Sequence, residues 1–211
     1  MKILVLSDKA LKEEMLSRPQ GSQVEYDWVE QPGELADFPD ADAVIDLQFR
    51  PERERIELLA GRLPKPVLVN SVTFELAVIH PRFIRFNGWP TFLQRRVWEI
   101  SVVDTEAKSR AERLFTELGW EWRFVPDLCG MIAPRIVSAI INEAYFALGT
   151  GVSGKDEIDK AMRLGTNYPY GPFEWSGKIG LERIYELLNR LAGKDKRYEI
   201  APCMREELGY R

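Results

Sequence analysis

The chain has 211 residues, of which 45% are hydrophobic and 29% are charged, and its formal net charge is -4. This composition is typical of a globular chain that forms one domain or two small ones. The acidic balance argues against a general nucleic-acid binder, which normally carries a basic face. Two cysteines, Cys129 and Cys203, provide neither a disulfide framework nor zinc spacing, so we expect a reducing compartment.

The N-terminal apolar run is too short for a secretory signal, because it covers residues 3–6 and a charge follows at Asp8. No stretch approaches the roughly 20 apolar residues that a transmembrane helix needs. We therefore expect a cytoplasmic protein that contacts neither a membrane nor a nucleic acid.

Short apolar runs alternate with helical patterns in the first part of the chain. A continuous apolar run is typical of a buried parallel strand, and Pro or Gly residues mark the ends of the helical patterns between such runs. The predicted strands cover 3–6, 23–30, 43–47, 66–70, 82–85, 97–102 and 121–125, and the predicted helices cover 9–17, 51–60 and 105–118. This βαβ alternation predicts a doubly wound, mostly parallel sheet.

The later part of the chain has helical periodicity throughout. A hydroxyl followed by an acid three residues later indicates a helix start, and a glycine indicates a helix end. The predicted helices cover 132–148, 153–164 and 179–191, with Ser153 as an N-cap, Gly165 as a C-cap and Gly171-Pro172 as a turn. The change of pattern places a domain boundary at Asp127, with domains over 1–126 and 127–211.

Three motifs follow one another between Asp127 and Glu182. The first is Gly130-(x)4-Arg135, which enters a helix that carries Asn142-Glu143-Ala144. The second is Glu157-Ile158-Asp159-Lys160-Ala161-Met162-(x)2-Gly165, and the third is Pro169-Tyr170-Gly171-Pro172-Phe173. Their order and spacing resemble the C-terminal helical domain of the 3-hydroxyacyl-CoA dehydrogenase family.

This resemblance implies a fold and a substrate class. We expect a reduced Rossmann-like α/β domain with a parallel sheet, followed by an all-α domain of the 3-hydroxyacyl-CoA dehydrogenase C-terminal type. In this family the second domain contributes to the acyl-CoA site and forms most of a homodimer interface. The activity implied by resemblance alone is NAD-dependent interconversion of 3-hydroxyacyl-CoA and 3-oxoacyl-CoA, in fatty-acid or aromatic-acid breakdown.

The turn after the first strand lacks the glycines of a dinucleotide site. A Rossmann unit carries G-x-G-x-x-G here, so that backbone N–H groups at a helix N-terminus approach the pyrophosphate. This chain has Ser7-Asp8-Lys9-Ala10-Leu11, and its first glycine is Gly21. The cofactor-binding candidates are Ser7, Asp8 and Glu30, of which Glu30 matches the ribose-binding acid or is an ordinary exposed acid. The side chains and the charge of Asp8 argue against ordinary NAD binding.

The family's catalytic pattern aligns with residues 70–100 without gaps. By this resemblance Glu99 matches the glutamate of a histidine–glutamate pair in which the histidine removes the proton of the substrate hydroxyl. Asn87 stands at the histidine position, and a carboxamide cannot accept a proton at neutral pH. Val72 replaces an assisting serine, between Ser71 and Thr73. The candidate catalytic residues are therefore Glu99, Asn87, Ser71 and Thr73.

Several readings of the remaining residues stay open. Cations that are candidates to meet CoA phosphates are Arg50, Arg53, Arg85, Arg95 and Arg96. The aromatic residues Phe83, Phe86, Trp89, Phe92 and Trp98 line an acyl or adenine pocket or, more simply, fill a core or form a dimer contact. The only histidine, His80, precedes Pro81 and is more simply a turn residue than a relocated base. A single histidine excludes a histidine-rich metal site.

The first hypothesis is a family member with degenerate catalytic and NAD sites that retains acyl-CoA binding. One alternative is a working NAD-dependent dehydrogenase in which His80 serves as the base. The other alternative is a non-catalytic scaffold that dimerises with itself or with a full-length relative through the helical domain.

Overall fold

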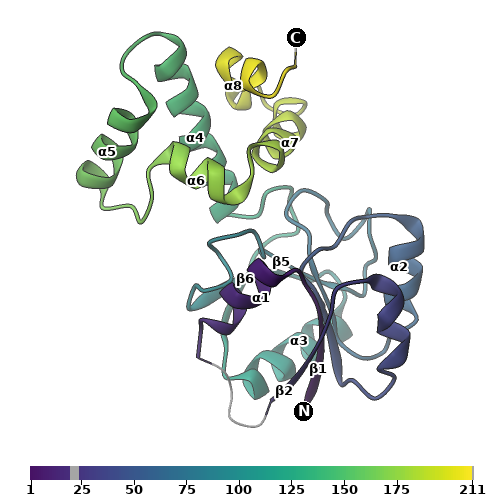
Figure 1. Cartoon of the computed structure of the whole chain (residues 1–211). Helices are drawn as coiled ribbons and strands as arrows, with labels where there is room; N and C mark the ends of the chain where they lie inside the picture. Colours follow the sequence, from purple (N-terminus) through teal and green to yellow (C-terminus); the bar gives the residue numbers. More distant parts are fainter. Residues whose placement is uncertain (20–23, 211) are drawn as a thin grey trace. The chain divides into compact units, whose positions relative to one another are not determined.

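The computed structural model describes residues 1–19 and 24–210, which form two compact units, Met1–Met131 and Ile132–Arg211 (Figure 1). The division lies later in the chain than the boundary expected at Asp127, because Asp127 bonds to residues of the first unit. Within the described ranges, no helix has both the length and the apolar character needed to cross a membrane.

The first unit is built on a seven-stranded sheet with the order β2-β1-β3-β4-β5-β6-β7. All neighbouring strands are parallel except β5 and β6, which are antiparallel. The strands are β1 (Lys2–Leu6), β2 (Glu25–Val29), β3 (Ala43–Asp46), β4 (Val67–Asn70), β5 (Ile84–Phe86), β6 (Val97–Ser101) and β7 (Glu121–Phe124). The predicted mostly parallel, doubly wound sheet is confirmed.

Helices cover both faces of this sheet (Figure 1). On one face, α1 (Lys9–Leu16) and α3 (Thr105–Leu118) pack against Ile3 and Val5 of β1. On the other face, α2 (Arg53–Ala60) and the 3-10 helix η1 (Pro32–Asp37) pack against Leu4 and Leu6. The apolar runs are continuous because these strands are buried on both sides.

The aromatic segment of the sequence belongs to the core of the first unit. Phe86 and Trp98 stack with ring centroids 4.9 Å apart, and Trp120 lies 4.7 Å from Trp98. Phe83, Trp89 and Phe92 are buried as well. Offset ring pairs of this kind add stability beyond the area that they bury. The core interpretation is therefore the one that the structure supports.

Three details of the first unit differ from the prediction. Strand β5 begins at Ile84 rather than at residue 82, because Pro81 and Arg82 lie in a turn closed by the bond from Phe83 N to His80 O. Pro51 precedes α2, whose N-cap is Glu52. The helix η1 was not predicted, and residue 23 of the predicted second strand lies outside the described residues.

The second unit contains only helices in its described part. These are α4 (Ala133–Gly149), α5 (Lys155–Thr166), α6 (Pro172–Ile179), α7 (Leu181–Ala192), the 3-10 helix η2 (Lys196–Tyr198) and α8 (Pro202–Glu207). The helix α4 contacts α6, α7 and α8, whereas α5 contacts α6 (Figure 1). The apolar face predicted for α7 is buried, and it consists of Ile184, Leu187, Leu188 and Leu191.

The ends of the helices in this unit depart from the predicted caps. The N-cap of α5 is Gly154 rather than Ser153, and its C-cap is Asn167 in the left-handed conformation, so that Gly165 lies inside the helix. The predicted turn at Gly171-Pro172 leads directly into α6, which was not predicted. Gly180, with φ of 100°, separates α6 from α7, because only glycine adopts this conformation readily.

Candidate functional site

The carboxyl ends of β1 and β3 form the edge at which an open α/β sheet binds nucleotides, since the strand order reverses between them. Asp8 follows β1 and is the N-cap of α1, and its Oδ1 accepts a hydrogen bond from Leu11 N at 2.8 Å. The helix N-terminus, which attracts anions through its N–H groups and its dipole, is thus occupied by the carboxylate of the chain itself.

A chain of polar side chains closes the same edge. The amide of Gln48 donates to Asp8 Oδ2 at 3.4 Å, and the backbone N of Gln48 donates to Asp46 Oδ1 at 3.0 Å. The Arg55 guanidinium binds both oxygens of Asp46, at 2.7 and 2.8 Å. Burial raises the pKa of the Asp46 carboxyl, and Arg55 opposes this shift by binding the charged form. This edge does not fit a dinucleotide pyrophosphate, which needs exposed N–H groups and no adjacent carboxylate.

The other two cofactor candidates lie nearby but on separate strands. Ser7 is buried in the same turn as Asp8, and its Oγ donates to Asp8 O at 2.8 Å. Glu30 is exposed at the end of β2, and its backbone N donates to Glu34 Oε2 at 3.0 Å. The hydroxyl of Ser7 and the backbone of Glu30 are therefore engaged in the local structure.

Two catalytic candidates lie directly opposite each other. The register of β5 with β6 pairs Phe86 with Ile100, so Asn87 follows opposite Glu99, and Asn87 N donates to Glu99 O at 3.2 Å. Opposed residues of antiparallel strands carry their side chains on the same face, close enough to touch. Asn87 is buried, and its Oδ1 accepts from Trp89 N at 3.3 Å. The structure thus brings together the two positions that the resemblance paired.

The remaining catalytic candidates follow β4. Ser71 and Thr73 are both buried, and the Ser71 hydroxyl donates to Phe74 O at 3.0 Å. The neighbouring Asn70 joins three segments, because its Nδ2 donates to Leu47 O and Gly88 O, and its Oδ1 accepts from Gly88 N. Asn70 therefore fixes the turn that carries Asn87, a role that the sequence did not single out.

A buried ion pair ties this region to the end of the first unit. Arg85 is completely buried and pairs with Asp127, so its interpretation as a surface cation for CoA phosphates is wrong. Its guanidinium also donates to Leu128 O, and Asp127 Oδ2 accepts from Leu76 N at 2.8 Å. Burial lowers the pKa of Arg85, and the charge of Asp127 opposes this effect. The pair holds the segment after β4, where Ser71 and Thr73 lie.

His80 lies in a turn and makes contacts of its own. Its Nδ1 accepts from Arg82 N at 3.2 Å, and its ring stacks on Phe83 at 4.7 Å. Burial and the charge of Arg82 lower the pKa of His80. These contacts match the interpretation of His80 as an ordinary turn residue before Pro81.

The motif residues of the helical unit hold helices together. The Asn142 amide donates to Glu199 O at 2.7 Å and accepts from Ala201 N at 3.0 Å, which joins α4 to the segment before α8. The Asp159 carboxylate accepts from Phe173 N at 2.7 Å and from Glu174 N at 2.9 Å, so that α5 supplies the cap of α6. These positions have structural roles in this chain.

Residues 130–208 match the family model of the 3-hydroxyacyl-CoA dehydrogenase C-terminal domain. The 3-hydroxyadipyl-CoA dehydrogenase of Escherichia coli is 46% identical over 163 residues, which cover 74% of this chain and 30% of that protein. The 3-hydroxybutyryl-CoA dehydrogenase of Bradyrhizobium diazoefficiens is 31% identical over 187 residues, which cover 81% of this chain and 64% of the relative.

The solved structures agree with these relatives. The crystal structure of (S)-3-hydroxybutyryl-CoA dehydrogenase from Ralstonia eutropha superimposes with a TM-score of 0.69 at 25% identity, covering 88% of this chain and 70% of that one. Residues 130–208 thus belong to the C-terminal domain family of the 3-hydroxyacyl-CoA dehydrogenases. The chain spans less than two thirds of both sequence relatives, and only 30% of the one from Escherichia coli.

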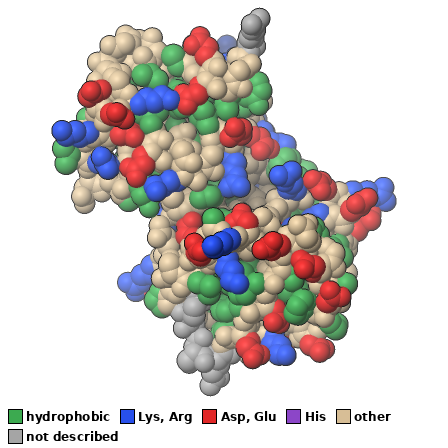
Figure 2. Space-filling view, viewed as in Figure 1, with side chains coloured by type: hydrophobic (Ala, Val, Ile, Leu, Met, Phe, Trp, Pro, Cys, Tyr) green, Lys and Arg blue, Asp and Glu red, His purple; other side chains and the backbone are tan. Residues whose placement is uncertain are grey.

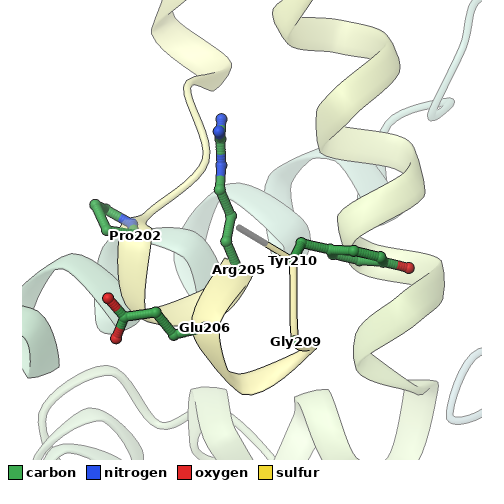
Figure 3. Close-up of a pocket in the computed structure, with 5 residues that line it drawn as sticks. All are labelled: Pro202, Arg205, Glu206, Gly209 and Tyr210. Carbon is green, nitrogen blue, oxygen red and sulfur yellow. The ribbon is translucent and has the colours of Figure 1, made fainter.

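The helical unit has a hollow of about 540 Å³ at its C-terminal helix (Figure 3). It is lined by Pro202, Arg205, Glu206, Gly209 and Tyr210. The Tyr210 ring packs against Tyr185 of α7, with centroids 4.6 Å apart. Acidic and basic side chains are interspersed on the face seen in Figure 2. Among the described residues, no cluster of His, Cys, Asp and Glu has the arrangement of a metal site.

Proposed function

We propose that this chain is a 3-hydroxyacyl-CoA dehydrogenase-like protein of acyl-CoA metabolism, with degenerate NAD and catalytic sites and retained acyl-CoA binding. The observation that carries the proposal is the carboxylate of Asp8 at the N-terminus of α1. A phosphate brought to this place would meet a negative charge and would have to displace a hydrogen bond that caps the helix. The N-terminus of α1 therefore favours the carboxylate of Asp8 over the pyrophosphate of a cofactor.

The opposed pair of Asn87 and Glu99 supports the same proposal. The backbone places Glu99 opposite Asn87, where the family resemblance expects a general base and its orienting carboxylate, but Asn87 contributes an amide without basicity at neutral pH. Losing such a base typically lowers the rate by about 10²–10⁴-fold. The alternative of a working enzyme that uses His80 as base has less support, since His80 Nδ1 already accepts a bond within its own turn.

Retained acyl-CoA binding is supported by the family match of residues 130–208 and by the relatives, which are dehydrogenases of 3-hydroxyadipyl-CoA and 3-hydroxybutyryl-CoA, both acyl-CoA thioesters. A second candidate is a non-catalytic dimeric scaffold. It is favoured by α5, which buries none of its residues and exposes 79% of Leu164. In that case the helical unit pairs with a second copy or with a full-length relative.

The test is NADH oxidation by the purified protein with acetoacetyl-CoA, beside Asn87→His and the control Asn87→Gln. We expect no turnover from any of them, together with calorimetric binding of acetoacetyl-CoA to the wild type. The histidine is compatible with the turn, because His80 Nδ1 accepts from the residue two positions later in the same way as Asn87 Oδ1 does.

Each other outcome has a definite meaning. Turnover by the wild type contradicts the degenerate site. Turnover only by Asn87→His shows that NAD still binds and that the base alone is missing. A fully folded protein that binds neither NADH nor acetoacetyl-CoA contradicts retained acyl-CoA binding and favours the scaffold.

A further inference from the structure

We propose that the chain pairs with a second copy of itself through the outer edge of β7, so that two sheets join into one continuous sheet. The strand β7 is the last in the sheet order, and β6 is its one strand neighbour within the part of the chain that the structure describes. Edge strands present unpaired backbone groups, which are a template for a further strand.

The hydrogen bonds of β7 show which of its backbone groups point outward. Val125 N donates to Ile100 O at 2.9 Å, so Val125 faces β6. Successive residues of a parallel strand face opposite neighbours, so Glu121 and Arg123 also face β6, whereas Trp122 and Phe124 face away. The bond from Arg123 Nη1 to Trp122 O at 2.9 Å agrees, since that carbonyl is open to a side chain. A hollow of about 370 Å³ runs along residues 120–124.

An antiparallel pair with its twofold axis at Trp122 uses these outward groups. Trp122 of each copy exchanges both of its backbone hydrogen bonds with Trp122 of the other, which is the bonded type of antiparallel pair. The N–H of Phe124 then meets the carbonyl of Trp120 of the second copy. Such an interface is isologous, because the same surface serves on both subunits, and it closes as a dimer.

The charges of β7 fit this register. The twofold axis places Glu121 of each copy opposite Arg123 of the other, which gives two such pairs. These residues form the non-bonded type of pair, in which side chains approach most closely. In the single chain Glu121 pairs with Arg96 at 2.6 Å on the surface, where an ion pair contributes little and is easily exchanged. Arg123 is exposed and is released from Trp122 O when that carbonyl takes a backbone partner.

The opposite edge of the sheet does not have this complementarity. The edge strand β2 carries Glu25 and Asp27, and a twofold axis at Tyr26 would place these two acids opposite each other. Like charges directly opposite are destabilising. A second copy of the chain is therefore favoured at β7 and disfavoured at β2. This pairing involves the first unit alone, so it depends neither on the proposed function nor on a dimer formed by the helical unit.

The test is sedimentation of the full chain over a range of concentrations, with the charge reversals Glu121→Arg and Arg123→Glu. Each single variant creates two like-charge pairs across the axis, so we expect its self-association to weaken roughly tenfold. The double variant E121R/R123E restores opposite charges and should associate like the wild type. An equimolar mixture of the two single variants should also associate, because every contact across the axis is then complementary. Glu117→Arg on the exposed side of α3 is the matched control, and it should leave association unchanged.

Hydrogen exchange provides a readout at the strand itself. The amides of Trp122 and Phe124 should gain protection as the protein concentration rises, whereas those of Glu121 and Arg123, which already face β6, should not change. Equal association of all variants overturns the proposal, since the contact then lies elsewhere. A wild type that stays monomeric, with concentration-independent exchange at Trp122 and Phe124, overturns it too. Near-ultraviolet circular dichroism confirms that each variant is folded.

Discussion

Asp8 acts on the first helix as an anion that the chain supplies itself. Its carboxylate accepts hydrogen bonds from Leu11 N and from the side-chain amide of Gln48, and it lies beside the positive end of the α1 dipole. The residue therefore has two effects that a single substitution can separate. The hydrogen bond that caps the helix requires only a side-chain oxygen at this position. The repulsion of a phosphate, in contrast, requires the negative charge.

We predict that Asp8→Ala lowers the free energy of unfolding by about 1 kcal/mol, because a helix N-cap is lost. Asp8→Asn should be close to neutral, since asparagine caps as well as aspartate does. Urea unfolding of the three proteins measures both effects. Equal losses in the two variants would mean that the charge rather than the cap matters for stability. A calorimetric titration with NADH on Asp8→Asn shows separately whether removing the charge reopens the edge.

At the scale of elements, α6 depends on a neighbour that is distant in sequence. Asp159 of α5 accepts hydrogen bonds from Phe173 N and Glu174 N, and Gly171 lets the two helices approach. A Cβ placed on Gly171 would overlap the side chain of Asp159. Because the φ of Gly171 is -71°, space rather than backbone conformation requires glycine there.

Two glycine substitutions test this arrangement. Gly171→Ala should destabilise the helical unit by roughly 1–3 kcal/mol, because the overlap moves Asp159 away from the N-terminus of α6. Gly177→Ala is the matched control: it lies inside the same helix with nothing within 4 Å of its Cβ, so it should stabilise by about 0.5–1 kcal/mol. Hydrogen exchange of the α6 amides measures both effects: protection should fall in Gly171→Ala and rise in Gly177→Ala. Unchanged protection in Gly171→Ala contradicts the argument.

Elements with a continuous apolar run or a long apolar face could be predicted from the sequence. The buried strands β1 and β3 and the long helix α4 are of this kind, because burial on both faces or along one face leaves a periodic signal. Short elements left no such signal. The helix α6 has eight residues and is capped by Asp159, which precedes it on another helix, so local sequence did not reveal it.

The candidate site could be predicted only in part, for a related reason. The resemblance paired Asn87 with Glu99, and the antiparallel register of β5 and β6 does place them opposite each other. The partner of Arg85 is 42 positions away along the chain, and an arginine in a strand pattern carries no sign of its burial. The closing of the nucleotide edge by Asp46 and Arg55 depends likewise on how α2 packs, which a linear pattern does not contain.

At the scale of the whole molecule, each unit has a core of its own. The apolar clusters on the two faces of β1 draw only on residues before Met131. The position of the boundary matters, however, because Arg85 is completely buried and its partner Asp127 is close to the end of the unit. Removing one member of a buried ion pair leaves an uncompensated charge inside the protein.

We therefore predict a difference between the fragments 1–131 and 1–126. The longer fragment should unfold cooperatively, with the far-ultraviolet signature of an α/β protein. The shorter fragment loses Asp127 and the carbonyl of Leu128, so its free energy of unfolding should be lower by about 3–5 kcal/mol. Thermal denaturation followed by circular dichroism compares the two. A fragment 1–126 as stable as 1–131 would show that Arg85 finds another partner or water. Arg85→Met in the shorter fragment should recover part of the loss.

The pair of Arg85 and Asp127 also sets an order on events during translation. Strand β5, which carries Arg85, leaves the ribosome well before Asp127 does, and during that interval the guanidinium lacks the carboxylate with which it forms its ion pair. Domains fold as units, with the N-terminal one first as synthesis proceeds. The first unit is consequently less stable until its last segment has been made. A pause in elongation before that point would leave β5 and its arginine open to chaperones, whereas a pause just after it would let the sheet form before the helices follow.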